Sequence, residues 1–365
     1  MSILTPTLSP RATPESRGSR LIEASERGWL PDWLIRLGMR KLMRQRLLDE
    51  GHDDGEFRST RARRLLDELR QSPIAVATDV ANQQHYEMPP DFFAAHLGPH
   101  LKYSCCFFPT GVESLPQAEE AMFHCYAERA KLADGQTILD LGCGWGSLSL
   151  WMAERYPRAT IVALSNSRGQ RQWIEARASE LGLTNLTVHT GDIANFDFAD
   201  MPPGGRFDRV VSIEMFEHMK SYGSLLAKVA GWMKPHAMLF VHIFAHRTLS
   251  YHFEARDQTD WMSRYFFTGG TMPSEALLLH FQDDLRVERQ WWLSGEHYAR
   301  TAEHWLARLD AARGELMPIL AQAHGETEAP LWFQRWRMFY MAVAELFGYG
   351  GGNEWGVSHY RFVKR

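Results

Sequence analysis

The stretch Asp140-Leu141-Gly142-Cys143-Gly144-Trp145-Gly146 stands between a predicted strand, residues 137–141 (TILDL), and a predicted helix, residues 147–156. Glycine occupies three alternate positions in this stretch. Because glycine has no side chain, it lets a ligand approach the backbone closely and lets the chain turn sharply. A plain strand-to-helix connection needs fewer glycines. The stretch therefore predicts a ligand-binding loop at the end of a strand.

The spacing of the glycines distinguishes two kinds of nucleotide site. A nicotinamide dinucleotide site has the pattern G-x-G-x-x-G, with an acidic residue about 20 positions further on for the ribose. Here the pattern is G-x-G-x-G, and the next predicted strand ends in Ser165 and Asn166 rather than in a carboxylate. Both differences count against a dinucleotide.

Outward from this loop, short β-rich runs alternate with amphipathic helical segments. Such alternation predicts an α/β protein with a parallel, doubly wound, Rossmann-like sheet and a ligand at the carboxyl ends of the strands. The predicted strands are residues 137–141, 160–164, 186–189, 207–213 and 238–244, and the predicted helices between them include 147–156 and 168–181.

The length of 365 residues exceeds that of a usual single compact core, so added layers are expected. The start of the chain is rich in Ser, Pro, Thr and Arg, and the region after residue 247 is aromatic-rich and helical in pattern. The predicted parts are a disordered segment (1–22), an N-terminal helical segment (23–130), the ligand-binding core (131–247), an inserted helical cap (248–325), and a C-terminal helix and edge strand that complete the core (326–365).

Charge and cysteine usage exclude several classes of protein. The net charge of −4 offers no footprint for nucleic acid, which requires an excess of Lys and Arg. No apolar run approaches the roughly 20 residues that span a bilayer, and the first 20 residues lack a signal-peptide pattern, so a cytoplasmic location is expected. The four cysteines lack zinc-site spacing and are expected to be reduced thiols, and no metal site is predicted.

A basic amphipathic helix is predicted at residues 29–48, where leucines recur at helical spacing between arginines and Lys41. Two interpretations are open. The helix lies on an anionic membrane as a peripheral contact, or it packs over the catalytic domain with its basic face in solvent.

The glycine spacing resembles the nucleotide loop of class I methyltransferases that use S-adenosylmethionine (SAM). Further motifs resemble the cyclopropane-fatty-acid synthase superfamily, and within it the plant branch of coclaurine and pavine N-methyltransferases. The motifs are HYEMP (85–89), HLKYSCCFF (100–108), LDLGCGWGSLSL (139–150), SNSRGQ (165–170), SIEMFEHMKSYG (212–223), FFTGGTMPS (266–274) and HYART (297–301). The resemblance implies the class I methyltransferase sheet and, because relatives often form dimers, a homodimer.

The resemblance also implies a set of residues that bind SAM. Two of them close over the cofactor, the glycines approach its methionine part, an amide pair lies along the ribose, and one further pair flanks the adenine. In that order these are Tyr103 and Ser104; Gly142 and Gly144; Asn166 and Gln170; and Asp192 and Ile193; Asp140 and Ser165 belong to the same site.

The methyl acceptor implied by the alkaloid branch is a small amine. In that branch the position matching Glu87, next to Tyr86, meets the amine, and the positions matching Glu217 and His218 are implicated in catalysis. The expected substrate-binding residues are Tyr86, Glu87, Glu214, His242 and Tyr298. Glu87 is otherwise a surface residue at a helix start, and Glu217 and His218 are otherwise a structural hydrogen-bonded pair.

An acyl lipid is the alternative acceptor. Cys105, Glu217, His242 and Tyr298 match the bicarbonate site of the lipid cyclopropane synthases, in which bicarbonate removes a proton after an alkene is methylated. The alkaloid enzymes share much of this set, so the four residues do not decide between the acceptors. A SAM-binding protein without catalysis is a third interpretation, against which the intact acid and histidine set counts.

Overall fold

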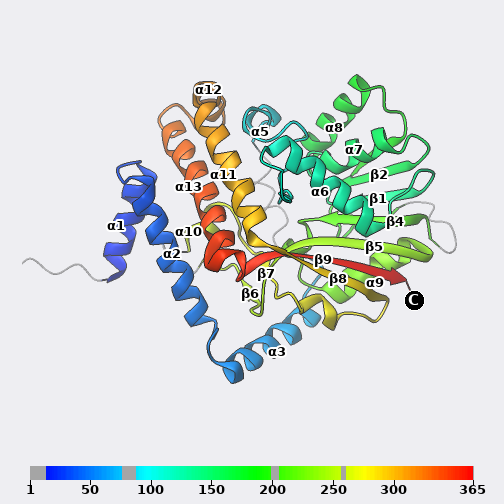
Figure 1. The fold of residues 1–365 in the computed structure, drawn as a ribbon, viewed down its shortest axis with the longest axis horizontal. Coiled ribbons are helices and arrows are strands. Elements are labelled where there is room, and N and C mark those ends of the chain that lie inside the picture. The colour runs from blue at the N-terminus through cyan, green and yellow to red at the C-terminus, as the bar shows by residue number, and fades with distance from the viewer. Residues whose placement is uncertain (1–13, 76–87, 199–204, 256–259, 365) are drawn as a thin grey trace, which may run out of the picture.

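The computed structural model describes residues 14–75, 88–198, 205–255 and 260–364 (Figure 1). In these residues the centre of the fold is a seven-stranded sheet in the order β3-β2-β1-β4-β5-β9-β8. The first five strands run parallel, and β9 is antiparallel to β5 and β8. The sheet strands are β1 (Thr137–Leu141), β2 (Thr160–Ser165), β3 (Leu186–Thr190), β4 (Phe207–Ile213), β5 (Met233–His246), β8 (Leu285–Ser294) and β9 (Trp355–Lys364); β6 (Tyr251–His252) pairs separately with β7 (Thr271–Met272).

Helices cover both faces of the sheet, because neighbouring strand residues point to opposite faces and both sets are apolar. Ile138 of β1 packs in the same cluster as the side chains of α6. The next residue, Leu139, packs in the cluster that contains the side chains of α9. The helices beside the sheet are α6 (Leu115–Ala130), α7 (Ser147–Arg155), α8 (Arg168–Glu180) and α9 (Tyr222–Trp232), and the short 3-10 helix η1 (Phe216–His218) follows β4.

A second helical layer stands beside the sheet, where α11, α12 and α13 run side by side (Figure 1). Aromatic side chains join α11 to α13: the Tyr298 ring stacks on Phe347 with centroids 4.3 Å apart. The layer comprises α11 (Gly295–Ala311), α12 (Arg313–His324) and α13 (Ala329–Gly348), with α1 (Pro14–Glu26), α2 (Asp32–Asp49), α5 (Pro90–His96), α10 (Trp261–Tyr265) and η3 (Tyr349–Gly352) near it. The remaining helices, α3 (Gly55–Gln71) and η2 (Leu277–His280), pack in the cluster that contains α9.

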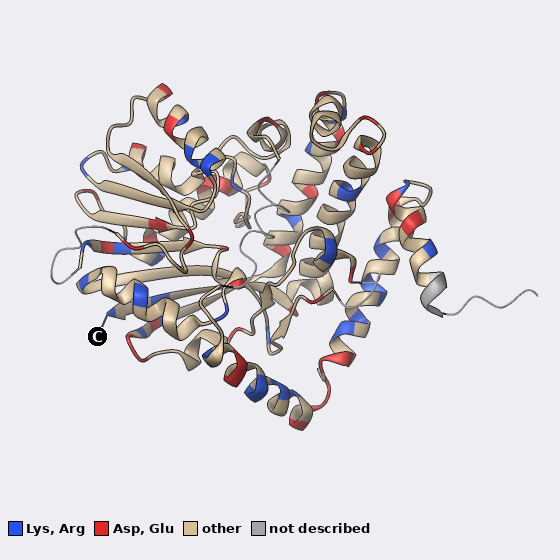
Figure 2. Cartoon of the chain, turned by 180° about the vertical axis from the view of Figure 1, so that it is seen from behind, with Lys and Arg blue, Asp and Glu red and all other residues tan. Residues whose placement is uncertain are grey.

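The predicted basic helix, residues 29–48, corresponds to α2, and it packs against α13. Ile35 and Leu47 are buried, and Arg36 donates hydrogen bonds to Glu303 of α11 and Glu345 of α13. Figure 2 shows Lys and Arg gathered along α2. The helix therefore covers the catalytic domain, as one of the two sequence interpretations expected.

Three predictions about the parts of the chain differ from the structure. The region 248–325 is not helical throughout, because β8 at Leu285–Ser294 pairs with β9 in the main sheet. The C-terminal strand β9 is not an edge strand: it lies between β5 and β8, and its first eight residues are buried. The segment predicted to be disordered, 1–22, overlaps α1 from residue 14 onward, whereas 1–13 lies outside the described residues.

The sequence of β9 gives little sign of its interior place. Ser358, His359 and Arg361 resemble the exposed residues of an edge strand, but each is buried against partners that are distant in the sequence. Among the helices in the described part of the chain, none is long and apolar enough to cross a membrane. All four cysteines are free thiols.

Candidate active site

The glycine loop leaves β1 and enters α7 as predicted. The backbone N–H groups of Gly142 and Cys143 both donate to the carbonyl oxygen of Leu164 in β2, at 2.9 and 3.1 Å, which holds the loop against the sheet. Gly144 has a φ of 54°, and a Cβ built on it would have no atom within 4 Å. The loop therefore presents bare backbone to open space at Gly144.

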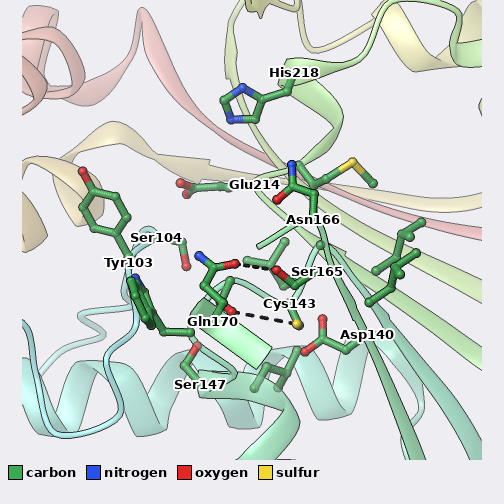
Figure 3. Close-up of a pocket in the computed structure, with 18 of the residues that line it drawn as sticks. Tyr103, Ser104, Asp140, Cys143, Ser147, Ser165, Asn166, Gln170, Glu214 and His218 are labelled. Carbon is green, nitrogen blue, oxygen red and sulfur yellow. Dashed lines mark hydrogen bonds between the residues drawn. The ribbon is translucent and has the colours of Figure 1, made fainter. Parts of the chain in front are cut away.

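That open space is a cavity at the carboxyl ends of the parallel strands (Figure 3). This is the place where open α/β sheets bind their ligands. All ten residues that the sequence analysis assigned to a cofactor line this cavity: Tyr103, Ser104, Asp140, Gly142, Gly144, Ser165, Asn166, Gln170, Asp192 and Ile193.

The polar groups of the wall suit a ligand with hydroxyl and carboxylate groups. The Ser165 hydroxyl bonds Oε1 of Gln170 at 2.6 Å. Nε2 of Gln170 is buried and has no hydrogen-bond partner among the described residues. A buried donor without a partner costs stability unless a ligand satisfies it, so this amide fits a cofactor that brings an acceptor. Asp140 accepts a bond from Ser149, and burial raises the pKa of its carboxyl to about 6.

A second cavity adjoins the first. Tyr103, Glu214 and His218 line both, so they stand where the two cavities meet. The rest of the second wall is apolar and aromatic apart from Glu217, and comes from β5, the 251–272 region, α11 and α13. Its other lining residues are Phe244, Phe253, Met262, Phe267, Met272, Tyr298, Trp305, Phe339, Val343, Leu346 and Phe347.

Glu214 is the best-anchored acidic group of the junction. Its Oε1 accepts from the Cys105 backbone N–H at 2.9 Å and lies 3.0 Å from Nε2 of His242. Its Oε2 accepts from the Tyr298 hydroxyl at 2.7 Å. The backbone of Glu214 has a φ of 49°, which is uncommon for a residue with a side chain and is maintained only where surrounding contacts enforce it. The hydrogen bonds from the Cys105 N–H and the Tyr298 hydroxyl favour the ionised form of the carboxylate.

Glu217 and His218 lie on η1, directly after β4, and have different surroundings. Burial raises the pKa of Glu217 well above its usual value, and the charge of Glu214 raises it further. Its Oε2 has no hydrogen-bond partner among the described residues. Burial lowers the pKa of His218 to about 4, and its ring lies 4.7 Å from that of Phe267. Burial also raises the pKa of Glu214, but the charge of Lys102 and hydrogen bonds from the Cys105 N–H and the Tyr298 hydroxyl oppose that rise. At neutral pH His218 is therefore neutral, burial favours the protonated form of Glu217, and Glu214 is the glutamate whose surroundings favour the carboxylate.

The five predicted substrate-binding residues separate into two groups. Glu214, His242 and Tyr298 are joined by hydrogen bonds, as described above. Tyr86 and Glu87 lie outside the described residues. The resemblance assigned Glu217 to the same bicarbonate set as His242 and Tyr298. In the described residues it is Glu214, and not Glu217, that is hydrogen-bonded to these two side chains.

Several residues of the site were missed. Lys102, Thr268 and Gly269 also line the first cavity. Lys102 is buried, and its Nζ donates to the Cys105 carbonyl at 2.8 Å. All three lie inside motifs that were quoted for the resemblance (HLKYSCCFF and FFTGGTMPS), so the motifs themselves were the available signal.

A glycine loop and cavity of this kind at the carboxyl ends of a seven-stranded sheet define a class I SAM-dependent methyltransferase. The protein is an enzyme of this class with SAM as its cofactor. It belongs to the mycolic acid cyclopropane synthetase family, whose family model matches residues 76–350.

Two curated plant proteins are similar to nearly the whole chain. (S)-Coclaurine N-methyltransferase of Thalictrum flavum subsp. glaucum is 38% identical over 94% of this chain and 95% of its own length. The enzyme of the same name from Papaver somniferum is 36% identical over 94% and 98%. The cyclopropane-fatty-acyl-phospholipid synthase of Escherichia coli K12 is 28% identical over 65% of this chain and 58% of its own length.

Solved structures show the same order of similarity. A coclaurine N-methyltransferase bound to N-methylheliamine and S-adenosylhomocysteine has a TM-score of 0.89, with 37% identity, and the alignment covers 94% of this chain and 99% of that one. The mycobacterial cyclopropane synthase MmaA2 shares the fold, with a TM-score of 0.66, 23% identity, and 80% and 99% coverage.

Proposed function

We propose that the protein transfers the methyl group of SAM to the nitrogen of a cyclic amine that carries an aromatic ring. The observation that carries the proposal is the second cavity. Its wall is aromatic and aliphatic, and its polar end at the junction holds Glu214, Glu217 and His218. Such a wall suits a flat ring, and an anchored carboxylate suits an ammonium group.

Glu214 also favours an amine over an alkene. The lipid mechanism requires bicarbonate, and the sequence assigned it to Cys105, Glu217, His242 and Tyr298. Three of these four residues already contact the Glu214 carboxylate. They do so through the Cys105 backbone N–H, the His242 ring and the Tyr298 hydroxyl. A carboxylate that belongs to the chain thus takes the donors that a bicarbonate ion would need. An amine acceptor leaves no carbocation, so it needs no such ion.

The residues of the chain have distinct tasks in this proposal. SAM supplies a methyl group on a sulfonium, held by the ten residues of the first cavity. Glu214 attracts the ammonium form of the substrate to the junction and orients its nitrogen. His218 offers a neutral imidazole, whose cationic form Glu214 would stabilise, as acceptor for the proton that must leave the nitrogen. The aromatic wall excludes water from the junction. Its contacts with the ring of the substrate hold the nitrogen in line for attack.

The test is a comparison of two acceptor sets with methyl-labelled SAM. One set holds cyclic secondary amines with and without a benzene ring, and the other holds vesicles of unsaturated phospholipid. Label is expected in the ring-bearing amines, and removal of bicarbonate should leave that turnover unchanged. Label in the lipid that disappears without bicarbonate would overturn the proposal in favour of the cyclopropane-type reaction.

The proposal includes a cytoplasmic location and a homodimer. Four free cysteines support a reducing compartment. Trp29, Trp33 and Leu37 are exposed on and before α2, where a second copy would cover them. Light scattering of the purified protein tests the dimer. Binding to anionic vesicles, abolished by Trp33→Ser, would instead assign these side chains to a membrane surface.

A further inference from the structure

A line of hydrogen bonds leads from Glu214 away from both cavities. Nε2 of His242 lies 3.0 Å from Oε1 of Glu214. Nδ1 of the same ring lies 2.8 Å from Nε2 of His359, on the neighbouring strand β9. Nδ1 of His359 in turn lies 2.7 Å from Nη1 of Arg129, on α6. Neither His359 nor Arg129 lines the two cavities described above.

Arg129 gives the line a direction. A guanidinium only donates hydrogen bonds, so Nδ1 of His359 accepts. A neutral imidazole with an accepting Nδ1 carries its proton on Nε2, which therefore donates to Nδ1 of His242. By the same rule, Nε2 of His242 carries the proton and donates to Glu214. The Tyr126 hydroxyl, 3.0 Å from Nδ1 of His242, can donate there as well.

Both imidazoles are held neutral, which this argument requires. His242 and His359 are completely buried, and burial lowers the pKa of each well below its usual value. The charges of Lys102 and Arg129 lower these pKa values further. The line does not carry protons outward, because arginine at its outer end cannot accept one.

If the hydrogen bonds ran in the opposite direction, Glu214 would have to be protonated. If His242 carried its proton on Nδ1, a lone pair on Nε2 would face Oε1 of Glu214, and the carboxyl would have to be protonated to bond it. His359 would then point an N–H at Arg129, donor against donor. Arg129 therefore selects, through His359, the tautomer of His242 that leaves Glu214 ionised.

We propose that Arg129 and His359 are positioning residues that fix the tautomer of His242 and so keep Glu214 as a carboxylate at the methyl-transfer junction. The tautomer itself is independent of the reaction. The consequence for catalysis rests on the proposed function, in which the Glu214 carboxylate attracts an ammonium substrate.

The direct test is nuclear magnetic resonance of the full chain labelled with ¹⁵N in its histidine rings. In the wild type, His242 and His359 should each carry the ring proton on Nε2 only. Arg129→Gln, whose amide can donate or accept, should give a mixture of tautomers at His359 and His242. Arg129→Lys, whose ammonium only donates, should retain the wild-type pattern. An Nδ1-protonated His242 in the wild type, or an Arg129→Gln protein with unchanged tautomers, would overturn the proposal.

A kinetic test connects the tautomer to the substrate. Arg129→Gln and His359→Phe should raise KM for the amine about tenfold, the loss expected when a hydrogen bond to a charged group is weakened. Affinity for SAM should not change. His359→Gln keeps a side-chain donor toward His242 and should restore most of the loss. Equal KM values in all variants, with altered tautomers, would overturn the link to Glu214.

The two proposals fail in distinguishable ways. If the wild type methylates no amine, the proposed function fails, while the tautomer measurement still tests the line from Arg129. If Arg129→Gln does not fold, the same tautomer and KM comparison is made between His359→Phe and His359→Gln, with SAM binding as the control for an intact fold. A His359→Phe protein that keeps both the wild-type His242 tautomer and the wild-type KM would overturn the role of the line.

Discussion

At the scale of single residues, the site depends on three neighbouring side chains with different surroundings. Burial raises the pKa of both glutamates, but Glu214 has donors and the charge of Lys102 that favour its carboxylate, whereas the charge of Glu214 raises the pKa of Glu217 further. Burial keeps His218 neutral. The two glutamates lie three positions apart in the sequence, and the motif alone does not distinguish them. Their roles follow from hydrogen-bond partners, which the sequence does not contain.

Replacing Glu214 by Gln tests its role as the binding charge. The substitution keeps the size but removes the negative charge and points an NH₂ group at one of three donors. We expect KM for the amine to rise about 10- to 100-fold, as for hydrogen bonds to charged groups, with the Kd for SAM nearly unchanged. Initial-rate kinetics and calorimetry measure the two effects. An unchanged KM would remove Glu214 from substrate binding.

The pH dependence tests His218. Because burial lowers the pKa of this imidazole to about 4, it is neutral throughout the range from pH 5.5 upward, and its titration should give no inflection near 6.5. Because the proposed site binds the ammonium form, kcat/KM should fall at alkaline pH as the free amine loses its proton. The inflection of kcat/KM should therefore move with the pKa of the amine when acceptors of different basicity are compared.

The corresponding variant is His218→Ala. General-base catalysis typically contributes about 10²–10⁴-fold, so kcat should fall by that order at pH 7, and the loss should shrink at alkaline pH. SAM binding serves as the control for an intact fold. A rate profile with a fixed inflection near 6.5 for every amine would show that a histidine of ordinary pKa titrates instead.

At the scale of elements, the loop between β1 and α7 allows a matched pair of substitutions. A side chain at Gly144 would enter open space in the first cavity. Gly182, after α8, has a similar positive φ and open surroundings but lies away from both cavities. Gly144→Asp should weaken SAM binding by roughly 100-fold or more, about 2.7 kcal/mol, since the carboxylate occupies the space and opposes the methionine carboxylate.

Gly182→Asp carries the same backbone penalty and should bind SAM normally. Calorimetry of both variants gives the comparison. Normal SAM binding by Gly144→Asp, or an equal loss in the two variants, would contradict the placement of the cofactor beside this loop.

The elements also show what the sequence could and could not predict. β1 and β4 have the predicted bounds, because each is a short apolar run next to a turn. The sequence did not predict β8, because its charged, partly exposed segment, LRVERQWWLS, resembles a solvated helix as much as an edge strand. The interior place of β9 could not be predicted, since it depends on pairing with β8, more than 60 residues earlier in the chain.

At the scale of the whole molecule, the site joins segments that are distant in the sequence, from Leu101 to Phe347. Eight of the ten predicted cofactor residues lie in the short motifs quoted above, and Asp192 and Ile193 follow the third predicted strand. The resemblance and the expected sheet topology predicted that the ten lie together. The line from Arg129 through His359 to His242 links three residues on separate elements. No spacing in the sequence indicates such a contact, so only the folded chain reveals it.

Helix α2 is connected to the site through α13, which it contacts. Glu345 of α13 pairs with Arg36 and Arg40 of α2, and only 10% of its side chain is exposed. Val343, Leu346 and Phe347 on the same helix line the acceptor cavity. Burial alone would raise the pKa of Glu345, but hydrogen bonds and charges from Arg40 and Arg36 outweigh it and lower the pKa below its usual value.

Replacing Glu345 by Gln should therefore destabilise the protein in a pH-dependent way. A carboxyl whose pKa is lower in the folded than in the unfolded chain stabilises the fold above the unfolded value, and this contribution is lost as the pH falls through the folded value. We expect a loss of about 1–2 kcal/mol at pH 7, less than for a fully buried pair because solvent screens the arginines.

Glu303→Gln, which removes a half-exposed partner of Arg36, is the matched control and should cost under about 1 kcal/mol. Urea unfolding at several pH values measures both, and the difference between wild type and Glu345→Gln should shrink below about pH 4.5. A difference that stays constant down to pH 3 would show that α2 is held by packing of Ile35 and Leu47 rather than by this charge.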